Sequence, residues 1–169
     1  TILSWIDTNN TLSSNLAVEH LVSTGCRTLA FMGGREEDRI FMDRLRGFRT
    51  AMERRGLEAK EEYITYNPPD VEAIFQSAAA LLELPVPPDG IICTNSLIAV
   101  GTMRAIQSRG LDIPGQVSMI AFDDHPYSLM VSPQPTIIDI DLFSLGVHAG
   151  NLLLKKIRDT AKLVQTYTA

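Results

Sequence analysis

The chain has 169 residues, of which 45% are hydrophobic and 21% are charged, and its formal net charge at pH 7 is -5. This composition predicts one globular domain that buries roughly 70% of the surface of its unfolded chain. The negative charge argues against a nucleic-acid-binding surface on this segment, since such surfaces depend on clustered Lys and Arg. No apolar run reaches the roughly 18 residues of a membrane helix and no secretory signal opens the chain, so no membrane contact is expected.

Cysteines and arginines carry little functional signal in this sequence. Cys26 and Cys93 lie far apart and form no C-x-x-C pair, which predicts two reduced thiols in a cytoplasmic protein rather than a zinc site or a redox motif. Most arginines gather in one stretch where they alternate with acids, which predicts a solvated helix face. These arginines are Arg39, Arg44, Arg46, Arg49, Arg54 and Arg55.

Strand-like and helical segments alternate along the chain. Short apolar runs predict strands at residues 2–6, 29–32, 63–66, 90–93, 117–122 and 136–140. In residues 38–55 the apolar positions recur every three or four residues, which predicts a helix with one apolar face. Asp70 is expected to cap the next helix, while Gly25, Gly56 and Gly110 are expected to end helices. Apolar strands that alternate with helices predict an α/β fold with a doubly wound parallel sheet.

Three polar residues follow predicted strands and should lie on the same rim of this sheet: Arg44, Asn95 and Asp123. Doubly wound sheets bind ligands at the carboxyl ends of their strands, where the loops open a crevice. A carboxylate accepts hydroxyl donors, a guanidinium donates through a fixed fork and an amide does both. The three residues together suit a neutral polyhydroxylated or heterocyclic ligand.

Each of the three residues also has a structural alternative. Asp123 taken alone is compatible with capping a turn, Asn95 with capping the helix that follows it, and Arg44 with being one more exposed helix arginine. Their convergence on one rim favours the binding interpretation.

Enzyme chemistry is not expected. A nucleotide-dependent enzyme on this fold needs G-x-G-x-x-G or G-x-x-x-x-G-K between strand and helix, and the sequence FMGGREEDR supplies neither. Asp123, Asp124 and His125 offer metal-binding atoms but lack a second His and a ligand spacing. The sequence therefore predicts no catalytic group, no metal and no cofactor.

Several sequence blocks carry a resemblance to a known family. They read AVEHLVSTGCRTLAFMGG, RLRGFRTAMERRGL and PDGIICTNSLIAVGTMRAIQSRGLDIPGQVSMIAFDD. In this order and spacing, the chain resembles the effector-binding domain of lactose- and galactose-repressor-type bacterial transcription regulators over nearly all of residues 10–157. The resemblance implies one lobe of a type I periplasmic-binding-protein-like fold, whose cleft holds a sugar or a nucleobase.

The resemblance also implies roles for individual residues. Arg44 in RLRGF, Asn95 in CTNS and Asp123 in FDD match the pocket residues of the family, and Asp124 is expected to hold the turn. These are the same residues that the rim argument selects. Weaker candidates for the effector site are Tyr66, Pro69, Ser96 and Asp141.

Two departures from the family pattern concern these candidates. Ser96 stands where family members usually have Asp, so the effector itself is expected to differ. The family often places Gln near residues 138–142, and the register leaves Asp139, Ile140 and Asp141 open for that position.

Aligned on the family, the chain divides into four parts. Residues 1–8 are expected to be a crossover strand between lobes and 9–138 the C-terminal lobe. Residues 139–160 are expected to form a crossover and a helix that belong to the other lobe, and 161–169 to begin a returning strand. Operator DNA would be read by an N-terminal segment absent from this chain, a fragment of a cytoplasmic regulator controlled by a small-molecule effector, with a sugar favoured. The alternative is a periplasmic sugar-binding protein of the same fold.

A homodimer is expected, because such regulators read operator half-sites in pairs. Helix 97–109 carries apolar residues almost all round, and the loop at 125–133 is unusually apolar, as exposed interface patches are. The predicted interface residues are Leu97, Val100, Met103, Tyr127 and Met130.

Overall fold

Five parallel strands form the central sheet of the structure, a computed structural model that describes residues 5–122, 132–158 and 166–168. In chain order they are β2 (Leu29–Gly33), β3 (Ile64–Tyr66), β4 (Gly90–Cys93), β5 (Ser118–Phe122) and β6 (Thr136–Ile138). Their order in the sheet is β3-β2-β4-β5-β6. The chain adds β3 on one side of β2 and then adds β4, β5 and β6 on the other side, so the strand order reverses between β2 and β4. The predicted α/β, doubly wound parallel sheet is confirmed.

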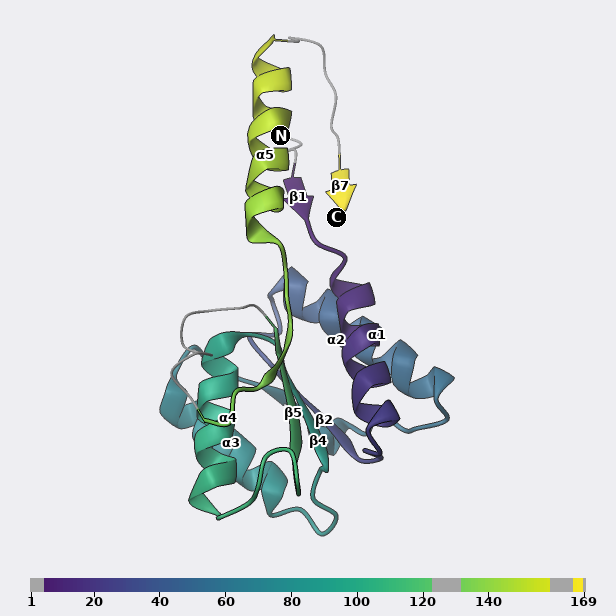
Figure 1. Cartoon of the computed structure of the whole chain (residues 1–169), viewed down its shortest axis with the longest axis vertical. Coiled ribbons are helices and arrows are strands. Elements are labelled where there is room, and N and C mark those ends of the chain that lie inside the picture. The colour runs from purple at the N-terminus through teal and green to yellow at the C-terminus, as the bar shows by residue number, and fades with distance from the viewer. Residues whose placement is uncertain (1–4, 123–131, 159–165, 169) are drawn as a thin grey trace.

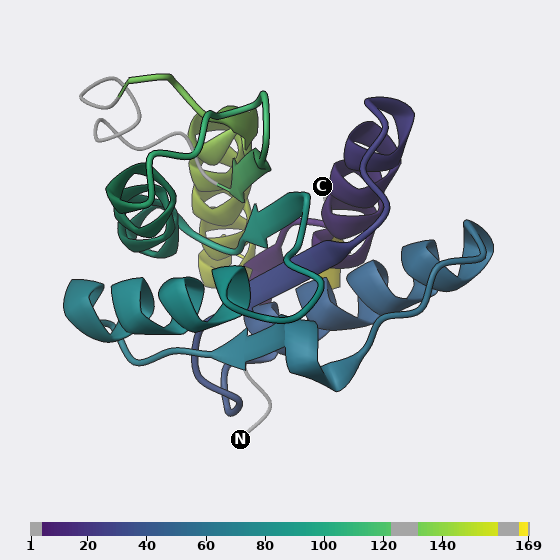
Figure 2. The same ribbon diagram turned by 90° about the horizontal axis from the view of Figure 1, so that it is seen from below.

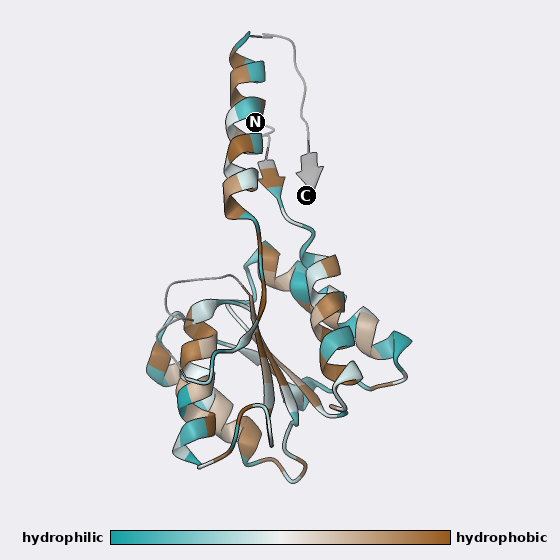
Figure 3. Ribbon diagram, in the orientation of Figure 1, coloured by the Kyte–Doolittle hydropathy of each residue, from teal (hydrophilic) through white to brown (hydrophobic). Residues whose placement is uncertain are grey.

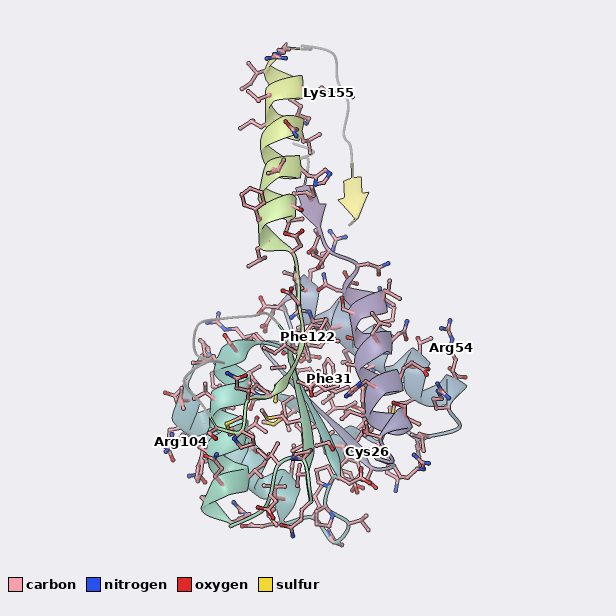
Figure 4. The ribbon with its side chains drawn as sticks, viewed as in Figure 1. Cys26, Phe31, Arg54, Arg104, Phe122 and Lys155 are labelled. Atoms are coloured by element: carbon pink, nitrogen blue, oxygen red, sulfur yellow. The ribbon has the colours of Figure 1, made fainter. Side chains whose placement is uncertain are left out.

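Helices cover both faces of this sheet (Figures 1 and 2). Helices α1 (Asn10–Ser23) and α2 (Arg39–Arg54) lie on one face, and α3 (Val71–Leu82) and α4 (Ser96–Ser108) on the other. Successive strand residues point to opposite faces, and the sequence of β2 follows this alternation. Phe31 joins the core beneath α1 and α2, whereas Ala30 and Met32 join the core beneath α3 and α4. Figure 4 shows Phe31 and Phe122 inside the molecule.

A second, smaller group of elements stands away from the sheet (Figure 1). Strand β1 (Trp5–Asp7) pairs in parallel with β7 (Thr166–Thr168), and α5 (Leu142–Arg158) lies beside β1. Helix α5 has no buried residue, although it carries large apolar side chains: Phe143 is 82% exposed and Ile157 is 67% exposed. Figure 3 shows the hydrophobic residues distributed along this helix.

Local capping agrees with the sequence. The Asp70 carboxylate accepts a hydrogen bond of 2.7 Å from the backbone N–H of Ala73, as an N-cap does. Gly25, Gly56 and Gly110 have φ angles of 107°, 68° and 66°, the left-handed conformation that ends a helix with little strain in glycine.

Several predicted boundaries are displaced, and local bonding explains them. Tyr63 lies in a short 3₁₀ turn, η1 (Glu61–Tyr63), rather than in β3, and its hydroxyl donates to the Val86 carbonyl oxygen. The strand predicted at 136–140 ends at Ile138, and α5 begins at Leu142, within the crossover and helix predicted for residues 139–160. The reason is that the Asp141 carboxylate accepts the backbone N–H of Ser144, so Asp141 is the cap of α5.

The arginine-rich helix is only partly the solvated face that the sequence predicted. The other five arginines of that group are exposed, and Figure 4 shows Arg54 at the surface, but Arg44 is 5% exposed. Both cysteines are free and buried, as the prediction of two reduced thiols requires. Within the described residues, no helix is both long and apolar enough to cross a bilayer.

Candidate functional site

A cleft of about 730 Å³ opens where the order of the strands reverses, at the carboxyl ends of β2 and β4. This is the position at which doubly wound sheets bind ligands. One wall belongs to the sheet and its helices and includes Ile40, Phe41, Arg44, Thr94, Asn95 and Ser96. The opposite wall comes from the end of β1 and the approach to α5 and includes Asp7, Thr8, Ile140, Leu142 and Leu145.

Arg44 is a fixed part of the first wall. Its Nε donates a hydrogen bond of 2.9 Å to Oδ1 of Asn10, and its Nη1 donates to the carbonyl oxygen of Thr94. The guanidinium also lies over the ring of Phe122, with its central carbon 4.3 Å from the ring centroid. A cation over an aromatic face gains electrostatic stabilisation that is largest where water is excluded. The alternative of an exposed helix arginine is therefore wrong.

Asn95 has a structural role and a place in the cleft wall at the same time. Its Oδ1 accepts a hydrogen bond of 2.9 Å from the backbone N–H of Ile98, so it is the N-cap of α4. The cap uses the amide oxygen, whereas a ligand in the cleft meets an amide that also carries two N–H donors. The two interpretations that the sequence left open are compatible with each other.

The weaker candidates separate into two groups. Ser96 lines the cleft beside Asn95. Tyr66 and Pro69 do not line it: Tyr66 packs edge-on against Phe41, with ring centroids 5.2 Å apart, and Pro69 is exposed. The structure therefore gives no support from this cleft for Tyr66 and Pro69 as effector-site residues.

Of the three residues that the register left open at 139–141, one lines the cleft. Ile140 lines the cleft, whereas Asp141 is absent from its lining. Asp141 instead accepts hydrogen bonds from both the backbone N–H and the hydroxyl of Ser144, at 2.9 and 2.6 Å. These bonds favour the charged form and lower the pKa of Asp141 below its ordinary value. Asp141 is therefore a helix cap rather than a ligand-binding residue of this cleft.

Three of the predicted functional residues lie outside the described residues: Asp123, Tyr127 and Met130. Their roles stay predictions. Phe122, which directly precedes Asp123, ends β5 and covers the guanidinium of Arg44.

The predicted dimer patch on α4 needs one correction. Met103 is 3% exposed and belongs to the core between the sheet and α3, so its side chain does not face solvent. Part of the apolar surface that surrounds α4 is covered within the chain, because α4 packs against α3 as well as against the sheet. Leu97 and Val100 are half-buried, and their place in an interface stays a prediction.

Sequence reasoning missed the second wall of the cleft and one buried partner of Arg44. Asp7, Thr8 and Leu142 line the cleft from the ends of β1 and α5, and Asn10 holds Arg44. The sequence feature that could have identified Asp7, Thr8 and Leu142 is their position in the two predicted crossovers between lobes. Within the described residues, no group of three or more His, Cys, Asp and Glu side chains could hold a metal ion.

Comparison with known proteins places the chain in a family. A family model described as a periplasmic binding protein-like domain matches residues 18–168. The chain belongs to this family. This periplasmic binding protein-like domain is 32% identical over 143 residues to the HTH-type transcriptional repressor PurR of Actinobacillus pleuropneumoniae serotype 3 (strain JL03), a match that covers 85% of the chain and 43% of PurR. It is 28% identical over 139 residues to the HTH-type transcriptional regulator GalR of Escherichia coli (strain K12), covering 82% of the chain and 40% of GalR.

A solved structure agrees with these matches. The periplasmic binding protein-like domain superposes with a TM-score of 0.91 on a regulatory protein of LacI family from Chloroflexus aggregans, at 27% identity, covering 98% of this chain and 60% of that one. The predicted resemblance to this type of regulator is confirmed, and the relatives do not favour a periplasmic sugar-binding protein. The chain spans less than half of the length of PurR and of GalR.

Proposed function

We propose that the chain is the ligand-binding part of a transcriptional regulator whose DNA binding is controlled by a small molecule. The names of its relatives, a repressor and a regulator of HTH type, support this function and not catalysis. The chain matches 43% of PurR, so operator binding is assigned to a segment outside it. A protein with this function would act in the cytoplasm, and it would need no cofactor.

The observation that carries the proposal is the joint presence of Arg44 and Asn95 in one cleft wall at the strand reversal. Ile40 and Phe41 add apolar surface to that wall. Donor groups beside apolar surface suit a ring compound with hydroxyl or carbonyl oxygens on its edge, such as a sugar or a nucleobase. Asp123 is proposed as the acceptor that completes this set, in keeping with its position after β5.

The two walls are proposed to belong to two lobes. Residues 9–138 would form one lobe, 1–8 and 139–160 would cross to the other, and 161–169 would return. Support comes from α5, whose Phe143 and Ile157 are largely exposed. Large apolar side chains exposed along one helix usually mark a surface that another part of a protein covers.

Control of DNA binding follows from a cleft with two walls. A molecule that touches Arg44 on one side and Thr8 on the other binds best at one separation of the lobes. It shifts the population toward that arrangement by its difference in affinity for the two arrangements. A homodimer, with Leu97, Val100, Tyr127 and Met130 proposed at its interface, would pass this change to paired operator half-sites.

The test is isothermal titration of the full-length protein with D-glucose, D-galactose, D-ribose, cellobiose and hypoxanthine. Asn95→Asp separates the two roles of Asn95, because Asp keeps the capping oxygen but loses the amide donors. We expect Asn95→Asp to retain its thermal stability and to bind at least about tenfold more weakly.

Asp70→Ala is the matched control, because Asp70 caps α3 and does not line the cleft. It should lose stability and retain affinity. If none of the five compounds binds the wild-type protein, or if Asn95→Asp binds as well as the wild type, the proposed site is refuted.

A further inference from the structure

Asn10, the first residue of α1, joins the two walls of the cleft through one buried side chain. It is 3% exposed, and its Oδ1 accepts the Nε–H of Arg44 at 2.9 Å. Its side-chain amide and its backbone N–H both donate to the carbonyl oxygen of Thr8, at 3.3 and 2.9 Å. Thr8 lines the opposite wall, so Asn10 connects the strand crossover to the guanidinium.

The close crossing of α1 and α2 keeps Asn10 in this place. A Cβ atom on Gly47, which lies three residues after Arg44 in α2, would be 2.4 Å from the carbonyl oxygen of Thr11. Only a glycine allows the two helices to approach so closely. The Thr11 hydroxyl also donates to the Asp43 carbonyl oxygen at 3.4 Å. The first turn of α1 is therefore fixed against the turn of α2 that carries Arg44.

Asn10 also determines how the guanidinium of Arg44 is turned. Asn10 holds Nε and the carbonyl oxygen of Thr94 holds Nη1, so two bonds fix the plane of the group. The ring of Phe122 lies against one face of that plane. Among these contacts, Asn10 supplies the side-chain hydrogen-bond acceptor. An asparagine side chain has one acceptor oxygen, and in Asn10 that oxygen binds Arg44.

We infer that Asn10 is a positioning residue of the effector site: it orients Arg44 toward the cleft and ties that orientation to the crossover at Thr8. The inference rests on the proposed function, since it gives Arg44 the role of a binding residue. Asn10 itself does not line the cleft and acts through Arg44. Through its bonds to the carbonyl oxygen of Thr8, Asn10 also holds the end of the crossover beside the guanidinium that the effector meets.

The first test reads the Arg44 guanidinium directly in the full-length protein. The Nε–H group gives its own nitrogen–proton NMR signal, and a buried hydrogen bond slows its exchange with water. In Asn10→Ala we expect a shifted Arg44 signal and exchange faster by about tenfold or more, because the acceptor is lost. Asn10→Asp keeps an oxygen at this position and should restore slow exchange.

Asn9→Ala is the matched control. Asn9 is the neighbouring residue and caps α1 through a bond of 3.0 Å from the backbone N–H of Leu12, so its loss weakens the same helix end. The side chain of Asn9 bonds within α1 itself, so its loss should leave the Arg44 signal in place. If Asn10→Ala does not fold, Asn10→Ser serves instead, because serine is too short to reach Arg44. An unchanged Arg44 signal in these Asn10 variants, or an equal change in Asn9→Ala, would overturn the inference.

The second test measures affinity for the same five compounds by titration. For any compound that binds the wild type, Asn10→Ala should raise the dissociation constant by roughly tenfold, whereas Asn10→Asp and Asn9→Ala should stay within about threefold. Unchanged affinity in Asn10→Ala, beside a disturbed Arg44 signal, would overturn the positioning role but not the proposed function. If no compound binds the wild type, the proposed function fails, and the NMR signal alone decides whether Asn10 orients Arg44.

Discussion

The guanidinium of Arg44 lies over the ring of Phe122, 4.3 Å from the ring centroid, and Phe122 is the last residue of β5. The buried cation of α2 thus rests on the end of a central strand. Phe122 is fully buried, so the contact is shielded from water and is stronger than a surface pair of the same kind.

Replacing Phe122 by Leu should therefore affect both stability and binding. We expect the free energy of unfolding to fall by about 2 kcal/mol, from lost packing and a lost cation–π contact. Affinity for an effector should fall with it. Phe48→Leu is the comparison, because Phe48 is equally buried but packs against Phe31. Urea denaturation should show similar losses for both variants, whereas titration should show weaker binding only in Phe122→Leu.

If the proposed function holds, Asp123→Ala in the full-length protein should abolish the response to effector and leave the fold and operator binding in place. A hydrogen bond to a charged group contributes roughly 1.5 to 3 kcal/mol, which corresponds to a loss in affinity of about tenfold or more. Because Asp124 is adjacent in the sequence, removing one of the two acids should leave stability unchanged or slightly higher. Asp124→Ala is the control and should reduce stability before affinity. If titration showed the loss of affinity in Asp124→Ala, and thermal melting showed the loss of stability in Asp123→Ala, then Asp124 would be the residue that faces the effector.

Gly47→Ala should destabilise the chain, because the added Cβ would meet the Thr11 carbonyl oxygen at 2.4 Å. Separating α1 from α2 should cost about 1 to 3 kcal/mol. Gly146→Ala in α5 is the matched change, since nothing lies within 4 Å of its added Cβ. Alanine there should raise stability by about 0.5 to 1 kcal/mol through its better helix propensity. Denaturant titration of both variants of the 169-residue chain tests the difference, and equal effects would contradict the close crossing.

Cys93 should be unreactive in the folded protein. Burial raises the pKa of Cys93 to about 12 from its ordinary value of 9.0, although a hydrogen bond with Thr102 acts in the opposite direction. At pH 9 only about one thiol in a thousand would be a thiolate. A Cys26→Ser variant isolates Cys93, and its reaction with a disulfide reagent at pH 9 should follow unfolding. Because the pKa of Cys93 is higher in the folded chain than in the unfolded chain, the free energy of unfolding should decline as the pH rises from 9 toward 12. Rapid labelling without unfolding would contradict this burial.

A charge at the proposed subunit interface should produce monomers. Leu97→Glu and Met130→Glu are expected to halve the mass measured by light scattering for the full-length protein. The comparison is Ser108→Glu, at an exposed position of α4 where the native side chain bonds within the helix, and it should leave the oligomer unchanged. Met103→Glu should unfold the protein instead, because Met103 is in the core. An unchanged mass in both Leu97→Glu and Met130→Glu would exclude this interface.

The order of strands and helices, and with it the rim that holds Arg44 and Asn95, was predictable from the sequence. Apolar strands alternate with helices, and carboxyl ends of parallel strands meet at one edge. The burial of Arg44 was not predictable, because its acceptor Asn10 lies 34 residues away and reaches it only through the crossing of α1 and α2.

Two errors have a common physical cause. The sequence shows that Met103 is apolar but not whether a second helix or a second subunit covers it, and α3 does so. It shows an acid at Asp141 but not which groups the carboxylate meets, and Ser144 is the nearest donor. In both cases a contact with a neighbouring group accounts for the residue, whereas the sequence predicted a contact with a second subunit or with an effector.

The hydrogen bonds of Arg44 have a consequence for the kinetics of binding. An arginine side chain free in solution loses about 2 kcal/mol of rotational entropy when it becomes ordered. Arg44 is already ordered by Asn10 and Thr94, which both belong to the body that carries it. An incoming molecule would therefore meet a rigid donor and would not wait for a side-chain rearrangement. The association rate should be limited by opening of the two walls, and differences in affinity between compounds should appear in their dissociation rates.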